Sequence, residues 1–130
     1  MLTITLPWPD GRLSGNREKS VHWAIKRRIT NDANMLAFTE TRNAVNSSML
    51  IPERLMLVIY FHPPHKRKYD ADNWHIACKP YIDGMCRALG IDDSKIRVSV
   101  EVIGERVKGG SVILQLRSSD GVSEFLGLVP

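Results

Sequence analysis

The order of hydrophobic and polar residues predicts a short strand at the start of the chain and a helix further on. Residues 2–6 form a β-favouring run that ends at the prolines and turn residues of 7–11. Residues 15–28 are polar and basic, which indicates a loop or an arm. Thr30 or Asn31 could then cap a helix that fades near residues 46–48. Its apolar side recurs every three or four residues, at Ala33, Leu36, Ala37, Thr41 and Ala44.

A second strand and a second helix follow in the middle of the chain. Residues 55–61 are almost continuously apolar and rich in β-formers, so they predict a central, buried strand. Residues 73–89 have helical periodicity, and Gly90 is a plausible C-cap. Pro80 leaves two alternatives open, since a proline inside a helix removes one hydrogen bond. Either the helix kinks there, or a short turn precedes a helix that starts near residues 79–80.

The remaining pattern predicts two more strands and one domain. Residues 97–103 and 111–116 alternate between apolar and polar side chains, and the glycine turn between them predicts a hairpin. The order β-α-β-α-β-β then indicates a single α+β domain over residues 1–117, with a mixed sheet and the helices mainly on one face. Residues 118–130 carry no clear pattern, and we interpret them as a C-terminal tail.

Length and composition fit one globular domain. The chain has 130 residues, 43% of them hydrophobic and 25% charged. No stretch approaches the ~18 to 20 apolar residues of a membrane span, and the start lacks the basic region of a signal peptide. Cys78 and Cys86 would be about 12 Å apart on one helix, too far for a disulfide. We therefore expect a soluble, cytoplasmic protein with two free thiols and no membrane partner.

Positive charge is modest in total but clustered. The net charge is +4, and the basic residues form a run at 65–68 and another at 26–28. Clustered positive charge attracts a polyanion through Coulomb steering and counterion release. Any single run could equally be solvated surface. The first run consists of His65, Lys66, Arg67 and Lys68, and Arg106 and Lys108 add to the total.

Acidic residues beside the basic run are candidates for a metal site. Asp70, Asp72 and Asn73 open the second predicted helix, where such residues often serve only as caps. A second acidic pair, Asp92–Asp93, follows the same helix. If the two groups converge, their carboxylates would repel one another unless a divalent cation lay between them. Mg²⁺ prefers hard oxygen ligands and needs only two or three carboxylates.

A lysine and a further aspartate lie within the same helical segment. Lys79 and Asp83 are four residues apart, and on a regular helix Asp72 would share their face. Lys79 and Asp83 could form an ordinary surface ion pair, which contributes little to stability. Alternatively, Lys79 could stabilise the charge that develops on a scissile phosphate.

Together these residues resemble the RusA family of Holliday junction resolvases. The resemblance runs from about Leu2 to Leu116 and includes residues 4–9, the Asp-x-Asp-Asn motif at 70–73, Lys79-x-x-x-Asp83 and the acidic pair. It implies a homodimer that binds four-way DNA junctions and makes paired, symmetric cuts with Mg²⁺. It also implies that Asp70, Asp72 and Asp93 are the essential carboxylates and that Lys79 is the essential lysine.

The chain departs from the family pattern at two places. Five residues separate Asn73 from Lys79, where the family's founding pattern has two. The three extra residues add about 4.5 Å of helical rise, so the lysine keeps nearly the same face but moves along it. Residues 10–13 also interrupt the usual path from the Pro-Trp-Pro segment to the Ser-x-Asn segment, which could alter the N-terminal arm.

We therefore expect a Mg²⁺-dependent endodeoxyribonuclease of DNA recombination and repair, with Mn²⁺ as a substitute. In this hypothesis the metal ligands are Asp70, Asp72 and Asp93, and Lys79 completes the catalytic set. Residues that bind nucleic acid would be His65, Lys66, Arg67, Lys68 and Asn73, although Asn73 could instead brace the site or cap the helix. Two alternatives remain: a non-catalytic, structure-selective DNA-binding protein, and a nuclease that acts on flaps, other branched substrates or RNA. His22 and Trp23 could stack on exposed bases, but we expect Trp23 to be a buried anchor.

Overall fold

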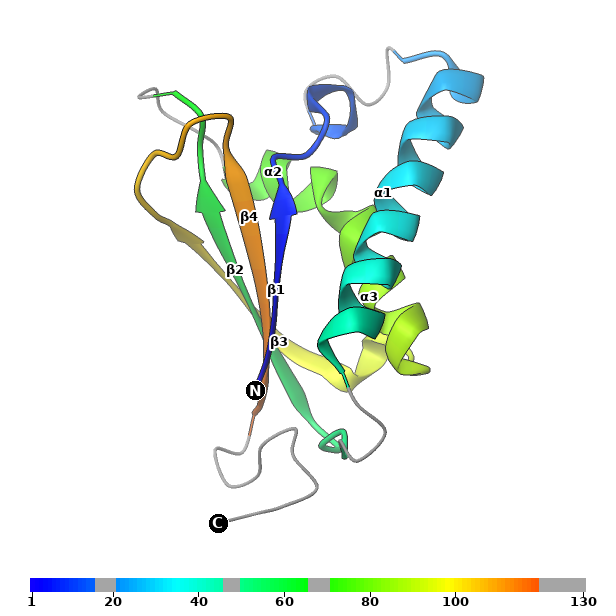
Figure 1. Ribbon diagram of the computed structural model, residues 1–130, viewed down its shortest axis with the longest axis vertical. Coiled ribbons are helices and arrows are strands. Elements are labelled where there is room, and N and C mark those ends of the chain that lie inside the picture. Colours follow the sequence, from blue (N-terminus) through cyan, green and yellow to red (C-terminus); the bar gives the residue numbers. More distant parts are fainter. Residues whose placement is uncertain (16–20, 46–49, 66–70, 120–130) are drawn as a thin grey trace.

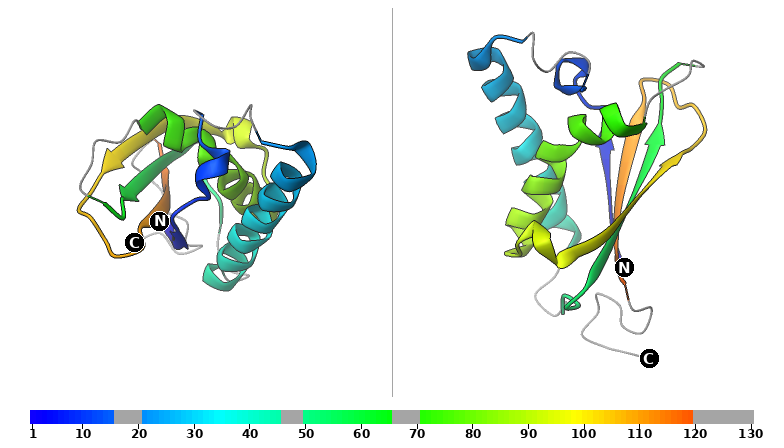
Figure 2. Two further views of the ribbon diagram at one scale, coloured as in Figure 1. Left: turned by 90° about the horizontal axis from the view of Figure 1, so that it is seen from above. Right: turned by 180° about the vertical axis from the view of Figure 1, so that it is seen from behind.

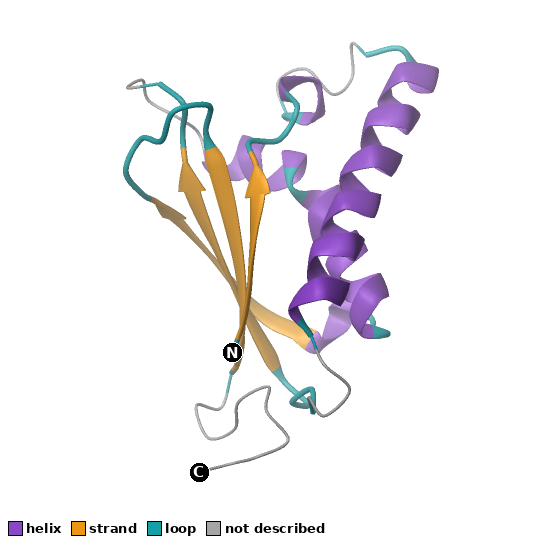
Figure 3. Cartoon of the chain, in the orientation of Figure 1, coloured by secondary structure: helices purple, strands orange, loops and turns teal. Residues whose placement is uncertain are grey.

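The computed structural model describes residues 1–15, 21–45, 50–65 and 71–119. These residues form one α+β domain, in which a mixed four-stranded sheet carries its helices on one face (Figure 1 and Figure 3). The predicted fold class is confirmed. Residues 120–130, the greater part of the predicted tail, lie outside the described residues.

The sheet places the most apolar strand in an inner position. Its strands are β1 (Leu2–Pro7), β2 (Leu55–His62), β3 (Ile96–Ile103) and β4 (Ser111–Ser118). Their order across the sheet is β1-β4-β2-β3. Strand β4 runs antiparallel to both β1 and β2, whereas β2 and β3 are parallel. The strands predicted at residues 2–6 and 55–61 are confirmed.

The predicted hairpin between the last two strands is wrong. Strands β3 and β4 are consecutive in the chain, yet both pair with β2, from its two opposite edges. Strand β2 is buried along most of its length, so the backbone N–H and C=O groups on both of its edges need hydrogen-bond partners from neighbouring strands. The connection at residues 104–110 is long enough to pass over the end of β2, which a tight hairpin turn would not allow.

The first helix begins earlier than the pattern predicts. Helix α1 spans Trp23–Ala44, so residues 23–28 belong to a helix and not to a polar arm. The basic residues of its first turns misled the prediction, because cations are unfavourable near a helix N-terminus. Tertiary packing outweighs that effect: Ile29 is buried against Leu13 and Ala77. A 3-10 turn, η1 (Gly11–Leu13), supplies the leucine.

The segment around Pro80 forms two helices. Helix α2 covers Ala71–Ala77, and helix α3 covers Lys79–Leu89 with Pro80 in its first turn. The sequence left open either one helix kinked at Pro80 or a turn followed by a helix that starts near residues 79–80. The structure shows a helix that starts at Lys79, but the segment before it is the short helix α2 and not a turn. Gly90 ends α3 in the left-handed conformation, with φ of 69°, and is the predicted C-cap.

The core lies between the sheet and the helices. Alternate residues of β1, β2 and β4 point toward α1 and α3 and are almost fully buried, among them Leu6, Phe61 and Leu114. The opposite face of the sheet carries no helix among the described residues (Figure 2). On β3 that face exposes Val98, Val100 and Val102. Within the described ranges, no helix combines the length and apolar character needed to cross a membrane.

Contact between α1 and α3 depends on one glycine. An ideal Cβ placed on Gly84 of α3 would collide with the backbone carbonyl of Asn34 on α1, and it would lie 3.2 Å from the Cβ of Ala37. We expect Gly84→Ala to lower the free energy of unfolding by about 2–3 kcal/mol, because backbone atoms must move apart. Urea denaturation measures the loss. Gly11→Ala is the matched control, since nothing lies within 4 Å of its added Cβ; equal stability of the two variants would contradict the prediction.

Candidate functional site

Lys79 links two segments that are distant in the sequence. Its Nζ atom lies 3.4 Å from Oδ2 of Asp93 and 3.7 Å from Oδ1 of Asp83. The first contact is also a hydrogen bond in which the lysine donates. All three side chains are about half exposed, with 59% for Lys79, 51% for Asp93 and 47% for Asp83. The structure thus brings together the predicted lysine and one predicted metal ligand in a solvent-accessible cluster.

The chain reversal after α3 places Asp93 in this cluster. Gly90 and Ile91 donate backbone hydrogen bonds to the carbonyls of Arg87 and Cys86, which turns the chain back along the helix. Asp92 then caps the 3-10 turn η3 (Asp93–Lys95), and its carboxylate accepts a hydrogen bond of 2.9 Å from the Ser94 amide. The hydrogen bonds from Ser94 lower the pKa of Asp92. Of the acidic pair, Asp92 therefore serves as a cap while Asp93 meets the lysine.

The buried thiol of Cys86 lies within the electrostatic field of the same cluster. Burial, together with the charges of Asp93 and Asp83, raises the pKa of Cys86 to about 11, whereas Lys79 acts in the opposite direction. Cys78, which precedes α3, has a pKa of about 12 because of burial. Both cysteines are free thiols, as predicted. They therefore stay protonated at neutral pH, and a protonated thiol is a weak nucleophile.

Helix α2 is held by aromatic packing that leaves its acidic residue exposed. The Trp74 ring packs against the Trp8 ring with their centroids 4.7 Å apart, and Trp8 in turn contacts Phe61 edge-on. Asp72 lies on the exposed surface of this short helix. Asn73 is half-buried, and its backbone carbonyl accepts a hydrogen bond of 3.3 Å from the Gly15 amide. This backbone contact ties α2 to the residues that follow η1.

A second pair joins α2 to the edge strand. Nδ1 of His75 lies 2.6 Å from Oε1 of Glu101 on β3, as an ion-pair contact outside ideal hydrogen-bond geometry. His75 is three residues beyond Asp72, so the two side chains project from neighbouring positions on α2. Our sequence prediction gave neither residue of the pair a role. The helical periodicity could have placed His75 beside Asp72, but nothing local indicates that a strand residue such as Glu101 meets it.

A pocket of about 320 Å³ opens beside the lysine. Lys79, Asp83 and His75 line it from α2 and α3, and Lys26 and Thr30 line it from α1. Sequence reasoning missed Lys26 as a site residue, because it assigned residues 15–28 to a loop or an arm and not to helix α1. Leu13 of η1 is also part of the wall. The segment that interrupts the family pattern at residues 10–13 therefore reaches the candidate site.

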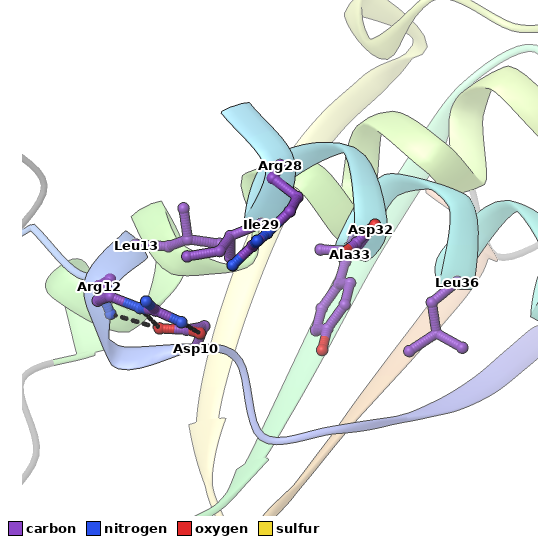
Figure 4. A pocket seen from close by; sticks show the side chains of 9 residues that line it. Asp10, Arg12, Leu13, Arg28, Ile29, Asp32, Ala33 and Leu36 are labelled. Atoms are coloured by element: carbon purple, nitrogen blue, oxygen red, sulfur yellow. Dashed lines mark hydrogen bonds and ion pairs between the residues drawn. The ribbon is translucent and has the colours of Figure 1, made fainter. Parts of the chain in front are cut away.

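A further pocket of about 300 Å³ lies between η1 and α1 (Figure 4). The Arg12 guanidinium forms a two-pronged ion pair with Asp10, at 3.0 and 2.8 Å, which holds the turn in place. Arg28, Asp32 and Tyr81 also line this pocket. The Tyr81 hydroxyl donates a hydrogen bond of 2.9 Å to the Pro7 carbonyl. Of the predicted catalytic residues that the structure describes, which are Asp72, Lys79 and Asp93, none lines this pocket.

The structure leaves part of the predicted site untested. Asp70, Lys66, Arg67 and Lys68 lie outside the described residues, while His65 is exposed at the start of that gap. Among the residues that the structure does describe, no three histidine, cysteine, aspartate or glutamate side chains form a group able to hold a metal ion. The expectation that Trp23 is a buried anchor is wrong. It is 69% exposed and stacks on His22, with ring centroids 5.8 Å apart, because it starts α1 beyond the edge of the core.

Comparison with other proteins gives one informative relative. The chain is 38% identical over 119 residues to an uncharacterized protein of Xylella fastidiosa (strain Temecula1 / ATCC 700964). The alignment covers 89% of this chain and 76% of that protein. No protein-family model matches the chain.

The buried thiols predict a loss of stability at alkaline pH. In the unfolded chain cysteines release their protons near pH 9, whereas the folded protein retains them until about pH 11 for Cys86 and about pH 12 for Cys78. Between these limits the unfolded state binds fewer protons, so the free energy of unfolding decreases as the pH rises. We expect a decrease of about 4 kcal/mol between about pH 8 and 10.5, about half of it from each thiol, measured by urea denaturation.

Cys86→Ala serves as the comparison for this titration. Removing one of the two thiols should reduce the decrease by roughly half, whatever its effect on stability at neutral pH. A variant whose stability falls as steeply as that of the wild type would show that the thiols do not cause the effect.

Proposed function

The chain belongs to the same family as the Xylella fastidiosa protein, and we propose that it is a Mg²⁺-dependent endodeoxyribonuclease that resolves Holliday junctions by paired, symmetric cuts. The observation that supports this proposal best is the contact of 3.4 Å between Lys79 and Asp93. It joins the lysine and the acidic pair of the RusA-like pattern across fourteen residues of sequence. An incidental likeness of short motifs would not require these two side chains to meet.

The donor set suits a hard divalent cation. Asp72 and Asp93 are both exposed and offer carboxylate oxygens, which Mg²⁺ prefers, and Asp70 would complete the predicted set. Mn²⁺, which accepts the same ligands, would substitute. When bound, such an ion would supply Lewis-acid stabilisation and an activated water for phosphodiester hydrolysis.

The residues of the chain itself would position and neutralise the substrate. An exposed ion pair is worth less than about 1 kcal/mol, so Lys79 can readily leave Asp93 for a phosphate oxygen. There it would stabilise negative charge as the phosphodiester bond breaks. Lys26, which lines the same pocket from α1, would hold a neighbouring phosphate. Asn73 would brace α2 from beneath, through Gly15.

The substrate and the assembly are part of the proposal. Two cuts related by a two-fold axis are made most simply by two copies of one chain, so we propose a homodimer on branched DNA. The buried free thiols suit a reducing compartment such as the cytoplasm. Nucleases that act on flaps or RNA would use the same residues.

One observation favours a non-catalytic alternative. Trp23 and His22 form an exposed aromatic stack at the start of α1, next to the basic residues of 26–28. Exposed aromatic rings among cations bind unpaired bases by stacking. A structure-selective DNA-binding protein would use this exposed aromatic and basic surface of α1, and it would need no metal-binding carboxylates.

Cleavage of a synthetic four-way junction separates these functions. With Mg²⁺ we expect the wild type to make paired nicks in the junction and none in a linear duplex of the same sequence. Asp72→Asn should bind the junction but lose cleavage by at least about a hundredfold, because it removes a charged metal ligand. Denaturing gels of strands labelled one at a time locate the nicks. Binding without cleavage in either Mg²⁺ or Mn²⁺ would reject the nuclease and leave the binding protein.

Lys79 provides an independent test of the catalytic assignment. We expect Lys79→Ala to lower the single-turnover cleavage rate by about 10²–10³, because the variant loses charge stabilisation in the transition state. The free energy of unfolding should change by less than about 1 kcal/mol, since both ion pairs are exposed. Lys79→Arg retains the charge and should recover part of the rate. Cleavage by Lys79→Ala at the wild-type rate would remove this residue from the mechanism.

A further inference from the structure

A basic pocket lies at the end of the sheet, apart from the cluster around Lys79. Its volume is about 550 Å³, and the described residues of its wall are Pro64, His65, Arg106, Lys108 and Gly109. Three of these five residues have basic side chains, and none is acidic. The residues come from two segments about forty positions apart, the end of β2 and the connection between β3 and β4.

The backbone fixes the two segments against each other. The Gly104 amide donates to the Phe61 carbonyl at 2.8 Å, and the Val107 amide donates to the Pro63 carbonyl at 3.0 Å. Between these bonds, Nδ1 of His62 lies 2.8 Å from the Glu105 carbonyl oxygen. These contacts lie on both sides of Arg106 along the connection. The basic residues are therefore carried by a backbone that is tied to β2 and do not lie on a free loop.

Two glycines allow the connection to close the pocket. Gly109 and Gly110 both have φ of 77°, a conformation that other residues adopt only with strain. The Gly110 amide donates to the Val107 carbonyl at 2.8 Å, which closes the turn. A Cβ on Gly110 would lie 2.7 Å from the Cβ of Trp8, so only glycine permits this approach.

We propose that this pocket binds the sugar–phosphate backbone of DNA, with Arg106 and Lys108 on one side and His65 on the other. Arginine offers a planar fork that matches phosphate oxygens, and lysine offers a compact positive charge. Because none of the described residues of the wall is a carboxylate, the pocket favours an anion over a cation or a neutral ligand. This inference rests on the proposed nucleic-acid substrate, and it adds Arg106 and Lys108 to His65, which the sequence analysis already predicts to bind nucleic acid.

The pocket lies within reach of a strand bound at α2. Trp8 contacts Gly110 on one side and Trp74 of α2 on the other. Ala71 follows His65 by six positions, a span of at most about 22 Å. Because successive base pairs rise about 3.4 Å, this span corresponds to no more than about six base pairs. One bound duplex arm could therefore contact both the pocket and the candidate catalytic residues.

The test measures binding of a fluorescein-labelled DNA duplex by anisotropy, without divalent ions, over about 50–200 mM salt. For Arg106→Ala/Lys108→Ala we expect weaker binding to every sequence, and a slope of log affinity against log salt that is smaller by about 2. Arg42→Ala/Arg54→Ala is the matched control. It removes the same charge away from the pocket, from the last turn of α1 at Arg42 and from the residue before β2 at Arg54. It should leave the slope near that of the wild type. Circular dichroism confirms that both variants fold.

Several results would overturn the proposal. One is an unchanged slope in the Arg106/Lys108 variant, and another is an equal decrease in the control, which would indicate net charge alone. A third is loss of inorganic phosphate binding with no change in DNA binding, which would identify a site for small phosphates. Cleavage assays keep the two proposals apart. A wild type that binds through the pocket but never cuts refutes only the nuclease, whereas a double variant that binds and cuts normally refutes only the pocket.

Discussion

Burial of β2 in the middle of the sheet determines the arrangement of the molecule. This strand is apolar on both sides of its pleat, and even Val58, on the face without helices, is only 6% exposed. It therefore needs a neighbour at each edge, and β3 and β4 fill these two places. Because β3 is parallel to β2, the chain must cross from one end of the sheet to the other. Helices α2 and α3 make that crossover, and it carries Asp72, Lys79, Asp83 and Asp93.

The crossover places opposite charges in an exposed cluster beside a closely packed interior. Beneath Lys79 and Asp93, the thiols of Cys78 and Cys86 are buried and remain neutral. The contact between the rings of Trp74 and Trp8 holds α2 against the packed core. In the proposed function, rigid support of this kind matters because phosphodiester cleavage depends on charges held in place. The weak pairing of Lys79 allows it to exchange a carboxylate for a phosphate.

Local patterns predicted the features that depend on local residues. Continuous apolar character identified β2, and Gly90 identified the end of α3, because both reflect nearby side chains. The spacing of Lys79 and Asp83 indicated their ion pair, which the structure confirms at 3.7 Å. Features that depend on distant packing were missed. Ile29 extends α1 toward its N-terminus only because Leu13 and Ala77 cover it.

The same distinction applies to the candidate site. No spacing rule indicates that Lys79 meets Asp93, or that His75 meets Glu101, because chain reversals bring these residues together. The hairpin prediction failed for a related reason. It paired β3 with β4 because they are neighbours in the sequence, whereas in the structure each of them pairs with β2. Asp70 lies outside the described residues, so the convergence of the three predicted carboxylates stays a prediction.

Paramagnetic Mn²⁺ provides the most direct measurement of that convergence. In a two-dimensional amide spectrum of the isotope-labelled protein, substoichiometric Mn²⁺ broadens the signals of residues close to the ion. If one ion is shared by the two ends of the crossover, the amides near Asp72 and those near Asp93 will broaden together at the same low Mn²⁺ concentration. Asp93→Asn will then abolish both effects. Broadening at only one end, or none until Mn²⁺ is in large excess, would contradict a shared metal site.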